Sequence, residues 1–141
     1  ISGSGKYNIL GTKGEAALIR IEVKSGADAA IFLRDVNIDL SEETDENKAC
    51  AFYIESGAKA DVYISGENKF ISGARRAGIE VPAGAELTIS SISGDDEPEG
   101  VLIAKGGRGG RGNARFANAQ KKQKATFSNA LRNTLQSKTA A

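Results

Sequence analysis

Three polar segments hold the residues of this 141-residue chain whose types and spacing suit chemistry. "SEETDEN", residues 41 to 47, and "SGDDEPE", residues 93 to 99, are acidic, whereas "SGARR", residues 72 to 76, is basic. Oxygen ligands clustered on a loop are what Ca²⁺ takes. The candidate calcium ligands are the acids of the second acidic loop, Asp95, Asp96, Glu97 and Glu99. The acids of the first loop, Glu42, Glu43, Asp45 and Glu46, form an alternative set.

Arg75 and Arg76 suggest an alternative role for these acidic residues, as partners in ion pairs. If the three segments lie at the same corner of a repeating fold, the two guanidinium groups come between the two acidic loops. The result is an ion-pair ladder across successive levels, which needs no ligand and competes with a bound cation. Neither acidic loop has the spacing of an EF-hand. We therefore expect no resident cofactor or metal, and we keep Arg75 and Arg76 as candidate ligand-binding residues.

Phe32 and Tyr63 are candidates for stacking on a sugar ring. The chain has no Trp and only 3 Tyr and 5 Phe, so an aromatic binding platform would be small. The two residues align in the repeat described below, which predicts an outward aromatic ladder. The alternative is that the rings stack on each other or are buried against a partner.

The composition of the chain argues against His-dependent catalysis, a cysteine nucleophile and a membrane span. The chain has no His, so catalysis through His is excluded. Its one cysteine, Cys50 in "KACAFYI", lies in an apolar run and is expected to be a buried small hydrophobe, not a nucleophile. No apolar run approaches the roughly 20 residues of a membrane span. We expect no enzyme and no membrane span.

A repeat must position these residues. "IEVKSGADAAIFLRDVNI" from residue 21, "FYIESGAKADVYISGENKF" from residue 52 and "IEVPAGAELTISSISG" from residue 79 align at a Gly-Ala turn. The turn glycines are Gly26, Gly57 and Gly84. Apolar residues alternate with period two around each turn, which is typical of half-buried strands. Stacking equivalent strands about 4.8 Å apart would bury their apolar rows together.

Two weaker matches extend the repeat. "VLIAKGG", from Val101, reads as a partial fourth copy, and the opening "ISGSGKYNI" matches "ISGENKFIS", which pairs Tyr7 with Phe70. The chain also lacks Met. We expect it to be a processed product or a piece of a longer protein.

The segments "AGIEVPAGAELTI", residues 77 to 89, and "GVLIAKGG", residues 100 to 107, resemble repeats of bacterial cell-surface proteins of the carbohydrate-binding-domain type. The resemblance covers about residues 1 to 112. It implies a right-handed parallel β-helix, a solenoid, and a glycan or polysaccharide ligand. The related pectate-lyase-like enzymes use acidic calcium ligands and a basic residue that removes a proton from the sugar. Arg75 or Arg76 would take that role here.

The charge changes sign along the chain. Residues 1 to 100 carry 10 Lys and Arg against 18 Asp and Glu, whereas residues 101 to 141 carry 9 Lys and Arg and no acid. "GGRGGRGN", residues 106 to 113, contains only two Arg and no aromatic residue, so we read a link and expect no nucleic-acid partner. The following segment is rich in Ala, Gln, Lys, Leu and Arg and predicts a basic amphipathic helix.

The predicted organisation is all-β: a short right-handed parallel β-helix over residues 1–107, a Gly/Arg-rich link over 108–112 and a C-terminal basic α-helix over 113–138. The helix caps the open end of the repeats, binds a second copy or another domain of a parent protein, or binds an anionic polymer or a membrane surface.

The leading functional hypothesis is a non-enzymatic structural or adhesive module of an extracellular or cell-surface bacterial protein, with carbohydrate as a ligand. A self-assembling subunit of a filament, shell or phage fibre is one alternative, because the acidic repeats of one copy can attract the basic helix of the next. A polysaccharide lyase is the other alternative.

Overall fold

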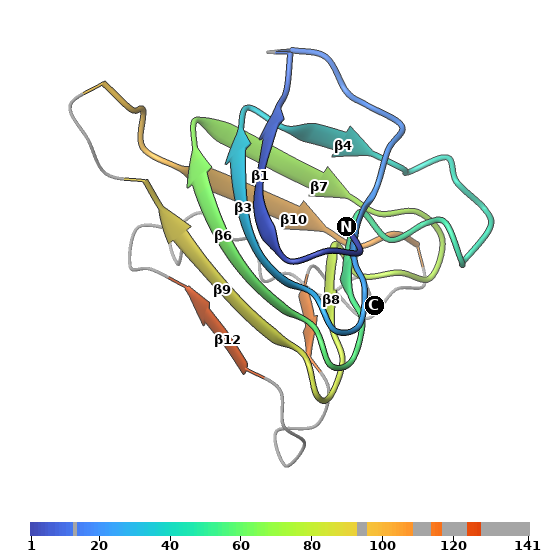
Figure 1. The fold of residues 1–141 in the computed structure, drawn as a ribbon. Helices are drawn as coiled ribbons and strands as arrows, with labels where there is room; N and C mark the ends of the chain where they lie inside the picture. Colours follow the sequence, from blue (N-terminus) through green and yellow to red (C-terminus); the bar gives the residue numbers. More distant parts are fainter. Residues whose placement is uncertain (13, 93–95, 109–113, 117–123, 128–141) are drawn as a thin grey trace.

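The computed structural model describes residues 1–12, 14–92, 96–108, 114–116 and 124–127 (Figure 1). These residues form strands and turns, without a helix, and the strands are arranged in three parallel sheets. In this described part of the chain, no helix is long and apolar enough to span a membrane.

The strands of each sheet lie side by side in a fixed order. The five-stranded sheet contains β1 (Gly5–Leu10), β3 (Asp28–Arg34), β6 (Lys59–Ser65), β9 (Glu86–Ser91) and β12 (Lys124–Phe127). The three-stranded sheet runs in the order β10 (Val101–Lys105), β7 (Glu67–Ile71) and β4 (Asn37–Asp39). The four-stranded sheet runs in the order β11 (Ala114–Phe116), β8 (Ile79–Val81), β5 (Phe52–Ile54) and β2 (Ile21–Val23).

The chain visits the three sheets in the same order at each level. β2, β3 and β4 form one level, β5, β6 and β7 the next, and β8, β9 and β10 the third. A partial level precedes them, in which the Ile1 amine donates to the Glu22 carbonyl at 2.8 Å and Ala17 bridges to Ile38. We call this partial level, Ile1, β1 and residues 17–19, the N-terminal end. Each sheet thus places side by side strands that are far apart in sequence.

The core is built from rows of inward side chains that match across levels. Ala29 lies opposite Ala60, which lies opposite Leu87, and all three are fully buried. The same register joins Ile31, Val62 and Ile89 in the next inward row. Between the other two sheets, the rings of Phe52 and Phe70 stack with centroids 5.6 Å apart. The period-two alternation of the sequence therefore becomes one continuous apolar core.

The predicted recurrent turn is confirmed. Gly26, Gly57 and Gly84 have φ values of 86°, 87° and 86°, a left-handed conformation that glycine adopts without steric cost. The turns lie directly on one another, since the amide of Gly26 donates to the Gly57 carbonyl and that of Gly57 to the Gly84 carbonyl. One backbone corner is thus repeated at three levels.

The predicted fold class, a short right-handed parallel β-helix ending in a C-terminal basic α-helix, is wrong. The described residues form three parallel sheets without a helix, and β11 and β12 lie within the expected helix of residues 113–138. β11 pairs with β8, and β12 pairs with β9. "ARF" and "ATF" each hold apolar residues two positions apart, the strand period, and pairing with an existing strand outweighed their helix propensity. The rest of that segment lies outside the described residues.

Two sequence alignments are also corrected. β1 pairs with β3 and places Tyr7 opposite Ile31, so the match of Tyr7 with Phe70 is wrong. β10 pairs with β7 and not with β8, so "VLIAKGG" is the third strand of its level and not a fourth copy of the turn. Of the predicted link over 108–112, only Arg108 lies among the described residues, and the domain boundaries stay predictions.

Candidate functional site

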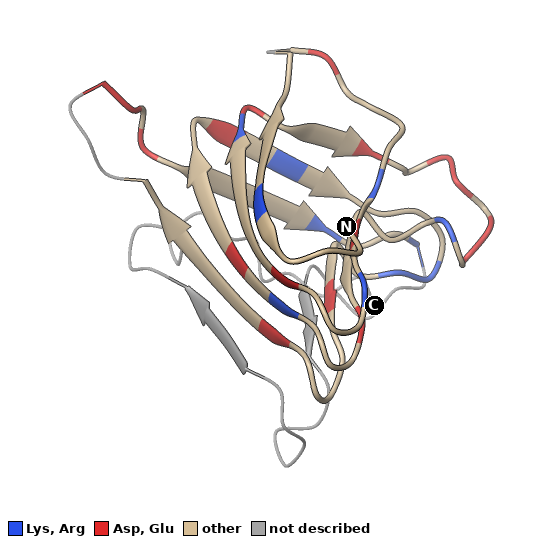
Figure 2. Ribbon diagram, in the orientation of Figure 1, with Lys and Arg blue, Asp and Glu red and all other residues tan. Residues whose placement is uncertain are grey.

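The corner between the three-stranded and four-stranded sheets brings the first acidic loop and the arginines together. Residues 40–51 connect β4 to β5, and residues 72–78 connect β7 to β8 one level on. The second connection lies on the first, because the Gly73 amide donates to the Ala49 carbonyl at 2.7 Å and the Ala74 amide to the Glu43 carbonyl at 3.1 Å. Acidic and basic residues gather at this corner, at the right of the view in Figure 2.

Arg76 is the most enclosed arginine of this corner. Its Nε donates to Glu80 Oε2 at 2.5 Å, and the two side chains are only 19% and 13% exposed. Its guanidinium lies over the Tyr53 ring, 5.4 Å from the centroid, and its Nη1 donates to the Glu46 carbonyl. Burial acts to lower the pKa of Arg76, but the hydrogen bond to Glu80 and the surrounding acidic groups raise it above its ordinary value. Arg76 is therefore a fixed cation.

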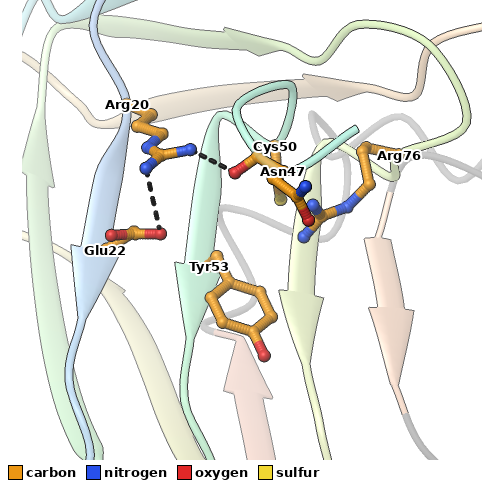
Figure 3. Close-up of a pocket in the computed structure, with 6 residues that line it drawn as sticks. All are labelled: Arg20, Glu22, Asn47, Cys50, Tyr53 and Arg76. Atoms are coloured by element: carbon orange, nitrogen blue, oxygen red, sulfur yellow. Dashed lines mark hydrogen bonds and ion pairs between the residues drawn. The ribbon is translucent and has the colours of Figure 1, made fainter. Parts of the chain in front are cut away.

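Arg20 approaches the same place from the other side. It lies just before β2, its Nη2 is 3.5 Å from Glu22 Oε1, and its Nη1 donates to the Asn47 carbonyl. In Figure 3 the guanidinium groups of Arg20 and Arg76 point toward one another across Asn47, with the Tyr53 ring beside them. The two arginines thus hold successive carbonyls of the acidic loop from opposite sides.

A cavity of about 220 Å³ lies between these groups. We call it the arginine pocket, and its lining residues are Arg20, Glu22, Asn47, Cys50, Tyr53 and Arg76 (Figure 3). A guanidinium carries five N–H donors, and the contacts among the described residues use only two on each arginine. Glu22 supplies acceptors, and Tyr53 supplies an apolar ring with a hydroxyl. The pocket can therefore donate to, accept from and pack against one small polar molecule.

Cys50 contributes no reactive group to this pocket. Its side chain is buried, and its Sγ donates to the Phe52 carbonyl at 3.2 Å. Burial, with the charge of Glu80 as a second cause, raises the pKa of the thiol to about 12. The thiol stays protonated near neutral pH, as the apolar run around it predicts.

The predicted ion-pair ladder forms on one side only. Arg75 Nη1 is 3.0 Å from Glu46 Oε1, so the loop of residues 41–47 does meet the arginines. Of the second acidic loop, the described residues 96–99 lie elsewhere, before β10, and Glu97 is 4.0 Å from Arg34. Arg75 itself is largely exposed, with 74% of its side chain accessible, and does not line the pocket.

The acidic loops do not assemble a metal site in the part of the chain that the structure describes. No group of three or more His, Cys, Asp or Glu is arranged there to hold an ion. Asp95 lies outside the described residues, and Asp96 and Glu99 are exposed. In the first loop, Asp45 is 3.7 Å from Lys48, and Glu46 pairs with Arg75.

Phe32 and Tyr63 stack on each other on the outer face of the five-stranded sheet. They lie in register on β3 and β6, with ring centroids 4.9 Å apart and planes inclined by 20°. The outward ladder predicted from the repeat is therefore present. Because each ring covers one face of the other, the pair offers less stacking surface than two separate rings.

The sequence pointed to Arg76 but missed Arg20, Asn47 and Tyr53. A signal existed, since Glu22, Tyr53 and Glu80 occupy the middle position of β2, β5 and β8 and lie in one outward row. A polar or aromatic residue between two buried apolar residues recurs there in all three copies. Asn47 and Arg76 lie in the acidic and basic connections, which their charge marks in the sequence, whereas nothing in the sequence marks Arg20.

Comparison with known proteins gives two partial similarities. A protein of Pediococcus pentosaceus named GTPase Obg is 44% identical over 66 residues, which is 42% of this chain and 15% of that protein. A protein of the same name from Mesoplasma florum is 44% identical over 55 residues, or 35% of this chain and 12% of that protein. The chain therefore matches only a small part of these relatives. No family model and no solved structure matches it.

Proposed function

We propose that this chain is a non-catalytic carbohydrate-binding module of an extracellular bacterial surface protein, and that the arginine pocket holds the sugar. The observation that carries the proposal is the placement of the Tyr53 ring beside Arg20 and Arg76, around one cavity. A sugar presents hydroxyl groups that both donate and accept, and C–H groups that pack on an aromatic ring. The pocket has a partner for each of these.

The size of the pocket limits the ligand. Its volume of about 220 Å³ is smaller than the roughly 300–1,000 Å³ of sites for drug-sized molecules. One sugar ring, at a chain end or a branch, suits it better than an extended polymer. The resemblance of the repeats to carbohydrate-binding surface proteins supports the same ligand class and the cell-surface location.

A lyase is not the preferred reading of this corner. A lyase base must take up a proton, but Arg76 has a raised pKa and is already paired with Glu80. Hydrolysis of GTP, which the name of the partial relatives implies for them, is not proposed either. The sequence contains no GxxxxGK[ST] segment to cradle phosphates, and the matches cover 15% and 12% of those proteins.

A glycan array tests the proposal. The intact chain is expected to bind one class of sugar, Tyr53→Ala is expected to abolish the signal, and Phe32→Ala combined with Tyr63→Ala is expected to keep it. The double variant is the matched control, because it removes outward aromatic rings from another sheet. Loss of binding in the double variant and its retention in Tyr53→Ala would assign the sugar to the stacked pair. Absence of any binding would refute the function.

A further inference from the structure

We propose, on the basis of the function proposed above, that the sugar in the arginine pocket carries one negative charge, on a carboxylate or an ester sulfate. The first observation is the balance of charge around the cavity. Its lining contains two guanidinium groups, on Arg20 and Arg76, and one carboxylate, on Glu22. Two positive charges and one negative charge leave an excess of one positive charge. A sugar with a single anionic group neutralises that excess, whereas a neutral sugar does not.

The two guanidinium groups also converge on the cavity. In Figure 3 they point toward one another, although they belong to connections one level apart. The Arg20 side chain is 34% exposed and that of Arg76 19% exposed, so water screens their repulsion only in part. An anion between them interacts favourably with both cations at once. The arrangement therefore favours a charged ligand over an uncharged one.

Unused donors on both arginines suit an oxyanion. Among the described residues, Arg20 uses Nη1 and Nη2, and its Nε makes no contact. Arg76 uses Nε and Nη1, and its Nη2, which carries two N–H donors, makes none. A carboxylate or sulfate group accepts several hydrogen bonds and donates none. Hydrogen bonds between a guanidinium and such a group are about twice as strong as those between neutral groups.

Glu22 limits the charge of the ligand to one. Its carboxylate lies between two cations, 3.5 Å from Arg20 Nη2 and 3.3 Å from Lys24 Nζ. It can still accept a hydrogen bond from a ring hydroxyl, but it repels a second negative charge. A phosphate monoester carries about −1.5 to −2 at pH 7, which exceeds the charge that the pocket can balance. A uronic acid or a sulfated sugar matches it better.

Isothermal titration of the intact chain with matched methyl glycosides tests this inference. The carboxylate probes are methyl glucuronide and methyl galacturonide, and their neutral counterparts are methyl glucoside and methyl galactoside. The 6-sulfate and 6-phosphate of methyl glucoside complete the set. At least one uronide or the sulfate is expected to bind at least about tenfold more tightly than its neutral counterpart. That advantage should shrink when NaCl is raised from about 0.05 M to 0.5 M. The uronide and sulfate arms show which oxyanion is preferred.

Arg20→Gln is expected to remove most of the advantage of the anionic probe while changing the affinity for its neutral counterpart less than about threefold. Arg75→Gln is the matched control, because it also removes one positive charge from this corner but lies outside the lining of the pocket. It should leave both affinities nearly unchanged.

Three results would overturn the inference: equal affinity for the anionic and neutral probes, tightest binding of the 6-phosphate, or an equal loss of uronide binding in Arg75→Gln and Arg20→Gln. A glycan-array signal confined to neutral glycans would also overturn it, yet would leave the proposed function standing. Absence of binding to any glycan, acidic or neutral, would refute the proposed function itself. The two failures are therefore distinguishable.

Discussion

The guanidinium of Arg76 lies over the ring of Tyr53, 5.4 Å from its centroid, although the two residues belong to successive levels of the structure. The hydrogen bond from Arg76 Nε to Glu80 fixes that position. The contact therefore has two effects: it joins the connection after β7 to the outer face of the four-stranded sheet, and it forms one wall of the arginine pocket.

Arg76→Ala should destabilise the fold by about 1–3 kcal/mol, because it leaves Glu80, whose side chain is 13% exposed, without its cation. Arg75→Ala should change the stability by less than about 0.5 kcal/mol, since that arginine is 74% exposed and its ion pair is screened by water. Urea denaturation of both variants measures the difference. Equal effects of the two substitutions would show that burial of the Arg76 pair contributes nothing.

Asn68→Leu should cost about 2–4 kcal/mol. The Asn68 side chain is fully buried, its Oδ1 accepts from the Val36 amide at 3.0 Å, and its Nδ2 donates to the Ser65 carbonyl at 3.1 Å. Leucine fills a similar volume but leaves the Val36 amide without this acceptor and removes one of the two donors to the Ser65 carbonyl, which also accepts from the Asp35 amide at 3.4 Å. The free energy of unfolding, compared with that of Asn37→Leu on the neighbouring strand, checks the value. A loss no greater than that of the control would contradict the account.

Gly73→Ala should destabilise the corner by more than about 2 kcal/mol, because a Cβ at this position would lie 2.4 Å from the carbonyl oxygens of Glu43 and Leu40. Those atoms are backbone and cannot turn aside. Gly3→Ala is the control, since its nearest atom would be 3.5 Å away, an ordinary contact. A drop in thermal midpoint for Gly73→Ala alone is the expected result, and matching midpoints would mean that the two connections are less tightly stacked.

Cys50 should make stability fall at alkaline pH. Its pKa is raised from 9.0 to about 12, chiefly by burial, so below pH 9 the thiol is neutral in both states and adds no pH dependence. Between pH 9 and 12 only the unfolded state loses the proton, which lowers the free energy of unfolding by about 1.4 kcal/mol per pH unit. Cys50→Ala should lack this component, so the slope of wild type minus variant isolates it. Parallel curves would show that the thiol ionises normally when folded.

The sequence predicted those features that depend on local pattern. The Gly-Ala turn and the alternating apolar rows can be read from the amino-acid sequence, because a left-handed corner needs glycine and a strand buries every second residue. The buried, unreactive state of Cys50 followed from its apolar neighbours in the same way.

Features that depend on contacts between distant segments were missed. The Ala-rich composition of residues 113–138 favours a helix by intrinsic propensity. β11 and β12 are strands nevertheless, because β8 and β9 offer free edges with which they pair. The second acidic loop was assigned to the wrong corner for a related reason. The chain turns tightly after β3 at Asp35 and after β6 at Gly66, where only one or two residues separate the strands. The described residues 96–100 lead into β10 at the same corner, and only the pairing of β10 with β7 shows this. The pocket needs both connections of another corner, so no single segment could predict it.

The most direct test of the proposed function is isothermal titration of the intact chain, Arg76→Lys and Arg75→Lys with the sugar that the array selects. Both substitutions keep the positive charge, and only the first changes a guanidinium that lines the pocket. We expect at least about a tenfold loss of affinity for Arg76→Lys, roughly 1.4 kcal/mol, and less than about a twofold change for Arg75→Lys. Equal affinities for Arg76→Lys and the unmodified chain would place the sugar outside the arginine pocket and refute the proposed binding site.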